Sequence, residues 1–300
     1  MKKITLICLF LLSGLSIISA QIKLSFNPEK GAKYLYTQDV VQQIKQTVMG
    51  QEMPMTMEMS MAYVMDVKEK SSQEIKAQFT YQDVGYNISS AMFSMKYDSK
   101  NPVENPSEMD IMMSKMFGSM IGKPFTVNVA PDGSVNSVTG MDAIVESMMQ
   151  SVASGNPMGA QMGASMKQQF NDDAMKSTFE QSFKIYPDRA VKAGDSWNTE
   201  QTTSQAGMNS IIKTQYTVKE IKNNIATIQL ESNVSMKPAT QGMEGDLSGM
   251  QTGVLLVDAK TGMTISSELT QNIKGSVKMQ GMDVSMELIS EIKISTEEIK

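Results

Sequence analysis

The chain has 300 residues, a formal net charge of −5, one cysteine and no histidine. The acidic balance and the lack of clustered lysines and arginines disfavour nucleic acids and anionic membrane surfaces as partners. Because the one cysteine, Cys8, lies in an N-terminal apolar run, the rest of the chain excludes thiolate catalysis, disulfides, Ser-His-Asp triads and ordinary zinc sites.

The first 20 residues have the order of a secretory signal peptide. Lys2 and Lys3 are followed by an apolar run to Ile18 and by the small pair Ser19-Ala20. We therefore expect an exported protein, periplasmic or extracellular, that is cleaved after residue 20 and has no lipid anchor. The remaining residues, 21–300, are predicted to form a single β-rich domain. No other apolar stretch approaches the ~20 residues of a membrane span, and no pattern predicts an oligomeric state.

Strict alternation of apolar and polar residues is the clearest local signal. The apolar positions are Met53, Met55, Met57, Met59, Met61, Tyr63, Met65 and Val67. A period of two predicts a β-strand with one apolar face. A strand of this length must bend, as it would in a curved sheet.

Three amphipathic helices are expected in the middle of the chain. Ser107 is a candidate N-cap for the first, which carries its apolar residues at helical spacing as far as Ile121. The second begins near Asp142 and continues to Val152. The third is expected over residues 162–183.

Hairpin signals surround these helices. Strands near Phe125 and Val138 flank the turn Pro131-Asp132-Gly133, in which proline presets one angle and glycine accepts a positive φ. Residues 263–277 and 282–294 alternate again, with a turn at Gly281. The predicted fold is therefore mainly β with a helical insert: long antiparallel curved strands form a sandwich or half-barrel, and the central helices cover one side.

Two parts of the chain share landmarks in the same order. Residues 63–79 match residues 216–230 in pattern, and a turn that begins at Asp98 parallels one that begins at Asp258. We interpret residues 26–140 and 184–300 as pseudo-repeats of one domain, joined by a helical connection over 141–183. The two aspartates could form a paired carboxylate site, but turn formation is the simpler role. Trp197, the only tryptophan, could stack on a sugar, although a core anchor is the more ordinary role.

The segment Val191-Lys192-Ala193-Gly194-Asp195-Ser196-Trp197 resembles the Val-Lys-x-Gly-Asp-Ser-Trp signature of an exported family of unknown function that is common in Bacteroidetes. Gly122 to Val127 and Pro131-Asp132-Gly133 resemble a second signature of that family. The resemblance covers most of the chain and implies no activity. More loosely, the expected fold resembles the half-barrel periplasmic carriers of lipoproteins and lipids.

Methionine is unusually abundant, at 30 of the 300 residues. Three interpretations are open: thioether binding of Cu(I), a flexible filling of a solid core, or the lining of a deformable apolar cavity. The leading hypothesis is a non-enzymatic protein that binds or carries a lipid-like ligand and needs no cofactor. The predicted cavity wall, covered by the Ser107 helix, is Met55, Met57, Met59, Met61, Met112, Met116, Phe117 and Met120. The alternatives are a structural or protein-interaction scaffold and, less favoured, Cu(I) binding or a carboxylate-dependent hydrolase.

Overall fold

The computed structural model describes residues 21–152, 167, 170–205, 207–239, 244–279 and 282–300. Within these residues there are twelve strands and three helices. The strands of the first half are β1 (Lys33–Val48), β2 (Gln51–Lys70), β3 (Ile75–Ser90), β4 (Ser94–Asp98), β5 (Pro124–Val129) and β6 (Val135–Thr139). Those of the second half are β7 (Ser196–Gln205), β8 (Met208–Lys222), β9 (Ile225–Pro238), β10 (Glu244–Asp258), β11 (Thr264–Met279) and β12 (Met282–Ile299). The helices are α1 (Glu108–Gly118), α2 (Met141–Val152) and α4 (Asp172–Phe183).

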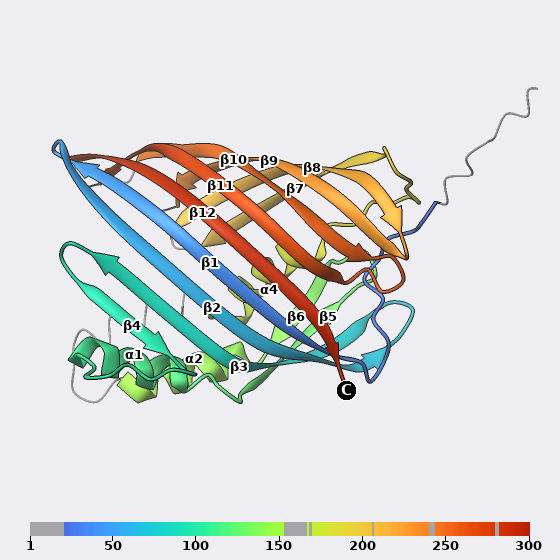
Figure 1. Cartoon of the computed structure of the whole chain (residues 1–300), viewed down its shortest axis with the longest axis horizontal. Coiled ribbons are helices and arrows are strands. Elements are labelled where there is room, and N and C mark those ends of the chain that lie inside the picture. The colour runs from blue at the N-terminus through green and yellow to red at the C-terminus, as the bar shows by residue number, and fades with distance from the viewer. Residues whose placement is uncertain (1–20, 153–166, 168–169, 206, 240–243, 280–281) are drawn as a thin grey trace, which may run out of the picture.

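All twelve strands belong to one open antiparallel sheet. Its order is β6-β5-β3-β2-β1-β12-β11-β10-β9-β8-β7, and β4 pairs with β3. The first and last strands lie side by side, with Lys33 opposite Ile299 and Val48 opposite Val284. The two halves of the chain therefore form the two sides of the sheet and meet at the β1–β12 pair. The sheet curves strongly, so that both of its edges lie behind the middle strands (Figure 1).

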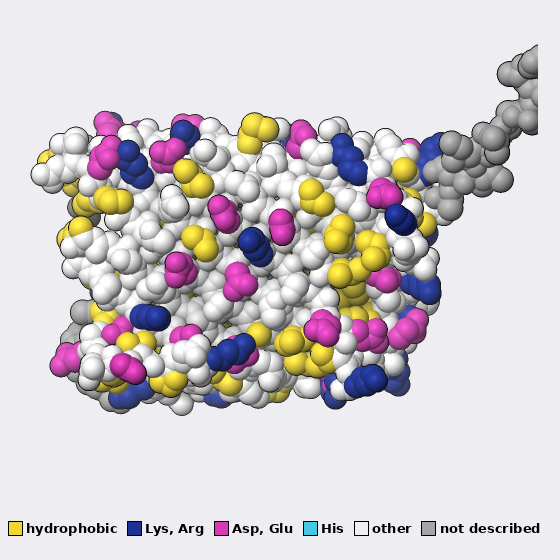
Figure 2. Space-filling model, in the orientation of Figure 1, with side chains coloured by type: hydrophobic (Ala, Val, Ile, Leu, Met, Phe, Trp, Pro, Cys, Tyr) yellow, Lys and Arg dark blue, Asp and Glu magenta, His cyan; other side chains and the backbone are white. Residues whose placement is uncertain are grey.

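Alternation divides the sheet into an inner and an outer face. The inner face, defined by residues such as Tyr36, Met61 and Ser290, carries most of the buried side chains. The outer face is mostly polar, with charged and hydrophobic side chains scattered over it (Figure 2). This division follows from the period of two in the strands.

Glycines on the inner face of β10 allow the backbone of β11 to approach closely. A Cβ placed on Gly249 would lie 1.9 Å from the carbonyl oxygen of Asn272 and 2.7 Å from the Cα of Ile273 on β11. Only a residue without a side chain allows this close approach of two strands. Glycines at such positions are a common means of curving a sheet.

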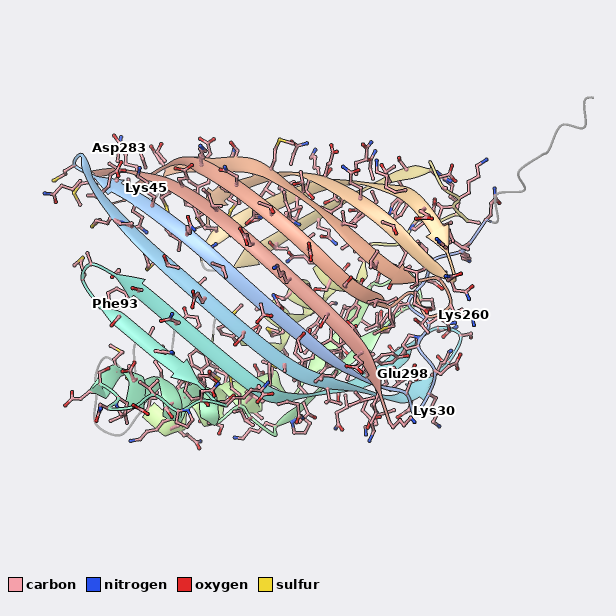
Figure 3. All side chains as sticks on the ribbon, in the orientation of Figure 1. Lys30, Lys45, Phe93, Lys260, Asp283 and Glu298 are labelled. Atoms are coloured by element: carbon pink, nitrogen blue, oxygen red, sulfur yellow. The ribbon has the colours of Figure 1, made fainter. Side chains whose placement is uncertain are left out.

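The two ends of the sheet differ. At one end lie hairpin tips, near the labelled Lys45, Asp283 and Phe93, and at the other lie Lys30, Lys260 and Glu298 (Figure 3). The N-terminal segment crosses this second end, where the amide of Phe26 donates to the carbonyl of Pro131 (2.9 Å). Leu24 and Phe26 are almost fully buried there, so this end of the sheet is closed by packed side chains.

The helices lie on the inner side. Helix α1 begins with a capping box: the Ser107 hydroxyl accepts from the Asp110 amide, and the Asp110 carboxylate accepts from the Ser107 amide. It contacts β4 and α2, whereas α4 contacts both β6 and β7, the two edges of the sheet. Helix α4 thus spans the gap between the edges (Figure 1). No helix in the described residues is long and apolar enough to cross a membrane.

Most of the elements expected from the sequence are present. The alternating segment around Met59 is part of β2, which has 20 residues, and the two C-terminal alternating segments are β11 and β12. The signal peptide, the Gly281 turn and most of the expected helical segment before Phe170 lie outside the described residues. All strands form a single open sheet, and no second sheet faces it among the described residues.

Candidate functional site: an uncharged cavity under α4

A cavity of about 300 Å³ lies between α4 and the inner face of the sheet. Helix α4 lines it with Thr178, Phe179, Gln181, Ser182 and Phe183, and the sheet lines it mainly from β1 and from β7 to β12. The aliphatic and aromatic part of the sheet lining includes Tyr36, Tyr63, Ile212, Tyr216, Leu230, Leu255, Leu269, Ile292 and Ile294.

Among the described residues, the lining of this cavity contains no Asp, Glu, Lys or Arg. Its polar groups are hydroxyls and amides, among them those of Gln38, Gln251 and Ser267. Burial raises the pKa of the Tyr36 and Tyr186 hydroxyls well above the ordinary tyrosine value, so both are neutral across the physiological range. The Tyr186 hydroxyl donates to the carbonyl of Gly262 (2.9 Å).

Aromatic packing holds α4 in place over the cavity. The ring of Phe179 lies 5.2 Å from that of Phe79 and 5.5 Å from that of Phe125, both on the inner face. The ring of Phe183 lies 4.8 Å from that of Phe26. Each such ring pair stabilises the fold by about 0.5–1.5 kcal/mol beyond the contribution of the apolar area that it buries.

The β5–β6 turn fits against the end of α4. Gly133 has φ +85°, and a Cβ there would lie 1.9 Å from the carbonyl oxygen of Phe183. The turn predicted from Pro131-Asp132-Gly133 therefore has a second role, because its glycine lets the backbone approach the C-terminus of the helix.

A row of polar side chains crosses the inner face at one level of the sheet. Each member is the register partner of the next on the neighbouring strand. The row consists of Gln42, Ser290, Gln271, Gln251, Ser232, Thr214 and Thr199, on strands β1, β12, β11, β10, β9, β8 and β7. We call it the polar row.

Hydrogen bonds join neighbours within the polar row. Gln42 Nε2 donates to Ser290 Oγ (3.1 Å), and Gln271 Nε2 donates to Gln251 Oε1 (3.3 Å). The hydroxyls of Thr214 and Ser232 share a bond of 2.8 Å. Thr214, Ser232 and Gln251 also line the cavity, so the row crosses the cavity wall.

In the described part of the chain, the buried hydroxyls without a partner include that of Thr199, at the end of the polar row, and that of Ser267, which lies outside the row on β11. Of these, Ser267 is the one that faces the cavity. Its side chain is 2% exposed and lines the cavity, and its Oγ has no hydrogen-bond partner among the described residues. Leaving a buried hydroxyl unpaired costs about 1–3 kcal/mol. A polar atom in the cavity, from a ligand or from water, would remove that cost.

The methionines predicted to line a cavity lie on the inner face of β2, on α1 and in the turn that follows α1. Met55, Met57, Met59 and Met61 are half-buried, and Met57 is the register partner of Gln42. They therefore continue the inner face onto β2, past Gln42 at the end of the polar row. The Tyr86 hydroxyl donates to Met57 Sδ (3.3 Å).

On α1, Met116 is buried and Met112 is half-buried, and Met120, just past the end of the helix, is buried. Phe117 packs its ring on those of Tyr86 and Tyr97, at 5.4 and 6.0 Å. Helix α1 thus packs on the sheet through these rings. The cavity under α4 is lined by other residues than the eight predicted.

Sequence reasoning missed the polar row, Ser267 and the role of α4 as the cover. A signal was present, since Gln, Ser and Thr occupy inward positions of otherwise apolar alternation, as Gln271 does between Leu269 and Ile273. Aligning these residues into one row required the register of seven strands. That register is a property of the folded sheet.

The remaining candidates have structural roles. Asp98 and Asp258 each accept amide hydrogens from the turn that follows, from Lys100 and from Lys260 respectively. A hydrogen bond from the Asn101 side chain is the main cause of the lowered pKa of Asp98. Trp197 stacks on Tyr216 at 5.3 Å and donates to the carbonyl of Ile185 (2.9 Å), as a core anchor would.

Two other possible sites carry less weight. The described residues contain no group of three or more His, Cys, Asp or Glu side chains that could hold a metal ion. A hollow of about 530 Å³ over β7 to β10 is lined in part by Glu200, Lys213 and Glu231. Lys213 and Glu200 form an exposed ion pair there at 3.3 Å, which is typical of a solvated surface.

Comparison with known proteins places most of the chain in one family model. The model described as "Family of unknown function (DUF6263)" matches residues 72–264. A search of curated proteins gives no match.

Among solved structures, lipovitellin, titled for its lipid–protein interactions, is 9% identical with a TM-score of 0.48. The match covers 90% of this chain, which spans about a quarter (25%) of the lipovitellin chain. An outer-membrane channel of Pseudomonas putida F1 is 5% identical over 91% of this chain and 98% of its own, with a TM-score of 0.24. OccK7 of Pseudomonas aeruginosa is 5% identical over 90% of this chain and 100% of its own, with a TM-score of 0.23. These likenesses are too distant to carry a functional argument.

Proposed function

Because the chain belongs to the DUF6263 family of unknown function, we propose a role from its own geometry: it is an exported, non-enzymatic protein that binds a hydrophobic ligand between α4 and the inner face of the sheet. Export is inferred from the signal-peptide pattern of residues 1–20.

The observation that carries this proposal is the uncharged cavity under α4. Ligand sites are concave, mainly apolar, and contain a few polar groups that orient the ligand, with volumes of about 300–1,000 Å³. The cavity has a volume of about 300 Å³, walls of aromatic and aliphatic side chains, and the buried hydroxyl of Ser267, which has no partner in the described part of the chain.

The chemistry of the lining favours binding over catalysis. General acid–base catalysis needs a group whose pKa lies near the operating pH. Within the residues that the structure describes, the polar groups of the lining are neutral amides and hydroxyls, including those of tyrosines, and burial raises the pKa of Tyr36 above the ordinary tyrosine value. These groups can orient a ligand, but none is suited to exchange a proton with it near neutral pH.

The shape of the sheet fits a carrier. We infer a half-barrel of two related halves, in which α4 bridges the two edges and the methionines of β2 extend the apolar surface past the polar row. Methionine side chains adapt to irregular apolar ligands because they are unbranched and flexible.

A pair of tryptophan substitutions tests the proposal. Leu269 lines the cavity and Thr270, the next residue of β11, is exposed on the outer face. Leu269→Trp should fill the cavity, whereas Thr270→Trp adds its bulk outside. We expect the apolar fluorophore diphenylhexatriene to bind the unmodified chain and Thr270→Trp but to bind Leu269→Trp at least tenfold more weakly. Equal binding to both variants would contradict a site under α4.

A further inference from the structure

The polar row lies between apolar surfaces on the inner face. On the side of the cavity, the neighbouring level is formed by Val40, Ile292, Leu269, Gly253, Leu230, Tyr216 and Trp197. On the other side it is formed by Ile44, Leu288, Ile273, Gly249, Val234, Ile212 and the polar Gln201, and of these Ile212 and Gln201 also line the cavity. A ligand that lies across the row would contact apolar residues on both sides of a polar level.

The polar row offers hydrogen-bond donors where it crosses the cavity wall. Gln251 uses its Oε1 to accept from Gln271, which directs its two N–H donors away from that bond. In the Thr214–Ser232 pair one hydroxyl donates to the other, so the hydrogen of the second hydroxyl can be given to a third group. An acceptor without a hydrogen of its own, such as a carbonyl oxygen, fits these donors.

The uncharged lining further restricts the class of ligand that the cavity can bind. A carboxylate or phosphate in this cavity would lose its water without gaining a cationic partner, because no described residue of the lining is Lys or Arg. Burying an unpaired charge is far more costly than burying a hydrogen-bonded neutral group. The cavity should therefore select against fatty acid anions and phospholipid headgroups.

We propose that the polar row at Thr214, Ser232 and Gln251 binds the ester carbonyl of a neutral acyl lipid, with the acyl chain under α4. This inference rests on the proposed function and specifies its ligand class. It assigns to the row the role of distinguishing a neutral ester lipid from a hydrocarbon and from a charged amphiphile.

The test is displacement of bound diphenylhexatriene by three competitors of equal chain length: a monoacylglycerol, the free fatty acid at neutral pH and a lysophospholipid. The variants are Gln251→Leu and the shape-conserving Thr214→Val. The control is Gln43→Leu, because Gln43 is exposed on the outer face of β1. Binding of diphenylhexatriene, which has no hydrogen-bonding group, reports on the cavity itself and on folding of each variant.

We expect the monoacylglycerol to displace the fluorophore at least tenfold more strongly than either charged competitor. Gln251→Leu and Thr214→Val should each weaken monoacylglycerol binding relative to fluorophore binding by roughly 3- to 10-fold, the value of one neutral hydrogen bond. The Gln43→Leu control should bind both molecules as the unmodified chain does. Equal displacement by the three competitors, or equal monoacylglycerol affinity in all variants, overturns the inference while the fluorophore still binds. Failure of the fluorophore to bind the unmodified chain overturns the proposed function itself.

Discussion

Replacing Ser267 with alanine should leave the free energy of unfolding of the ligand-free protein unchanged or raise it by about 1 kcal/mol. Its hydroxyl is buried without a partner among the described residues, so alanine removes a desolvation cost and breaks no described hydrogen bond. Ser290→Ala is the matched control, since Ser290 is also 2% exposed and lies on the inner face of the adjacent strand. Its Oγ accepts from Gln42 Nε2 (3.1 Å), and losing that bond should cost about 1 kcal/mol.

The two variants should therefore differ by about 1–2 kcal/mol, with Ser267→Ala the more stable. Urea unfolding of the lipid-free proteins, followed by circular dichroism, measures the difference as a shift of the midpoint at constant slope. If Ser267→Ala were as destabilising as Ser290→Ala, the hydroxyl of Ser267 would have a partner in the folded protein. The description of the cavity as a site with an unfilled polar position would then be wrong.

Three further predictions concern packing, capping and pH. Gly133→Ala should destabilise the protein by about 1–3 kcal/mol more than Gly31→Ala. Both glycines have a similar positive φ, but Gly31 has open space around it, whereas a Cβ on Gly133 would clash with the carbonyl of Phe183. Thermal unfolding compares the two variants, and equal losses of stability would show that the turn does not contact α4 closely. Ser107→Ala should cost about 1 kcal/mol through the loss of the N-cap, measured by urea unfolding, and no loss would contradict the capping box. Burial raises the pKa of Tyr81 from 10.0 to about 12. The contribution of Tyr81 to the free energy of unfolding is therefore complete below pH 10 and is lost at about 1.4 kcal/mol per pH unit as the pH rises from 10 towards 12. Absorbance of the folded protein that showed Tyr81 ionising at the ordinary tyrosine pKa would contradict this.

Local sequence patterns predicted the elements correctly wherever the cause is local. The alternation of β2 and the capping signal at Ser107 each depend on neighbouring residues, and the structure confirms both. The turn at Gly133 was likewise predicted from adjacent residues, because φ +85° needs glycine.

Long-range arrangement was beyond local patterns. Nothing near Lys33 indicates that β1 pairs with β12, and the polar row exists only because the six registers that join its seven strands coincide. The cover of the cavity was expected to be the Ser107 helix, but the cavity found here lies under α4, whose rings Phe179 and Phe183 meet partners from distant strands and from the N-terminal segment. Amphipathic spacing identifies a helix and its apolar face without naming the surface that it covers.

Native mass spectrometry of the protein isolated from the cells that naturally produce it, followed by extraction of the bound molecules, tests the central claim most directly. The account predicts a neutral acyl lipid bound to the unmodified chain and to Thr270→Trp, and no such mass on Leu269→Trp. An unliganded mass for all three proteins, or a lipid that persists on Leu269→Trp, would contradict a ligand site between α4 and the inner face.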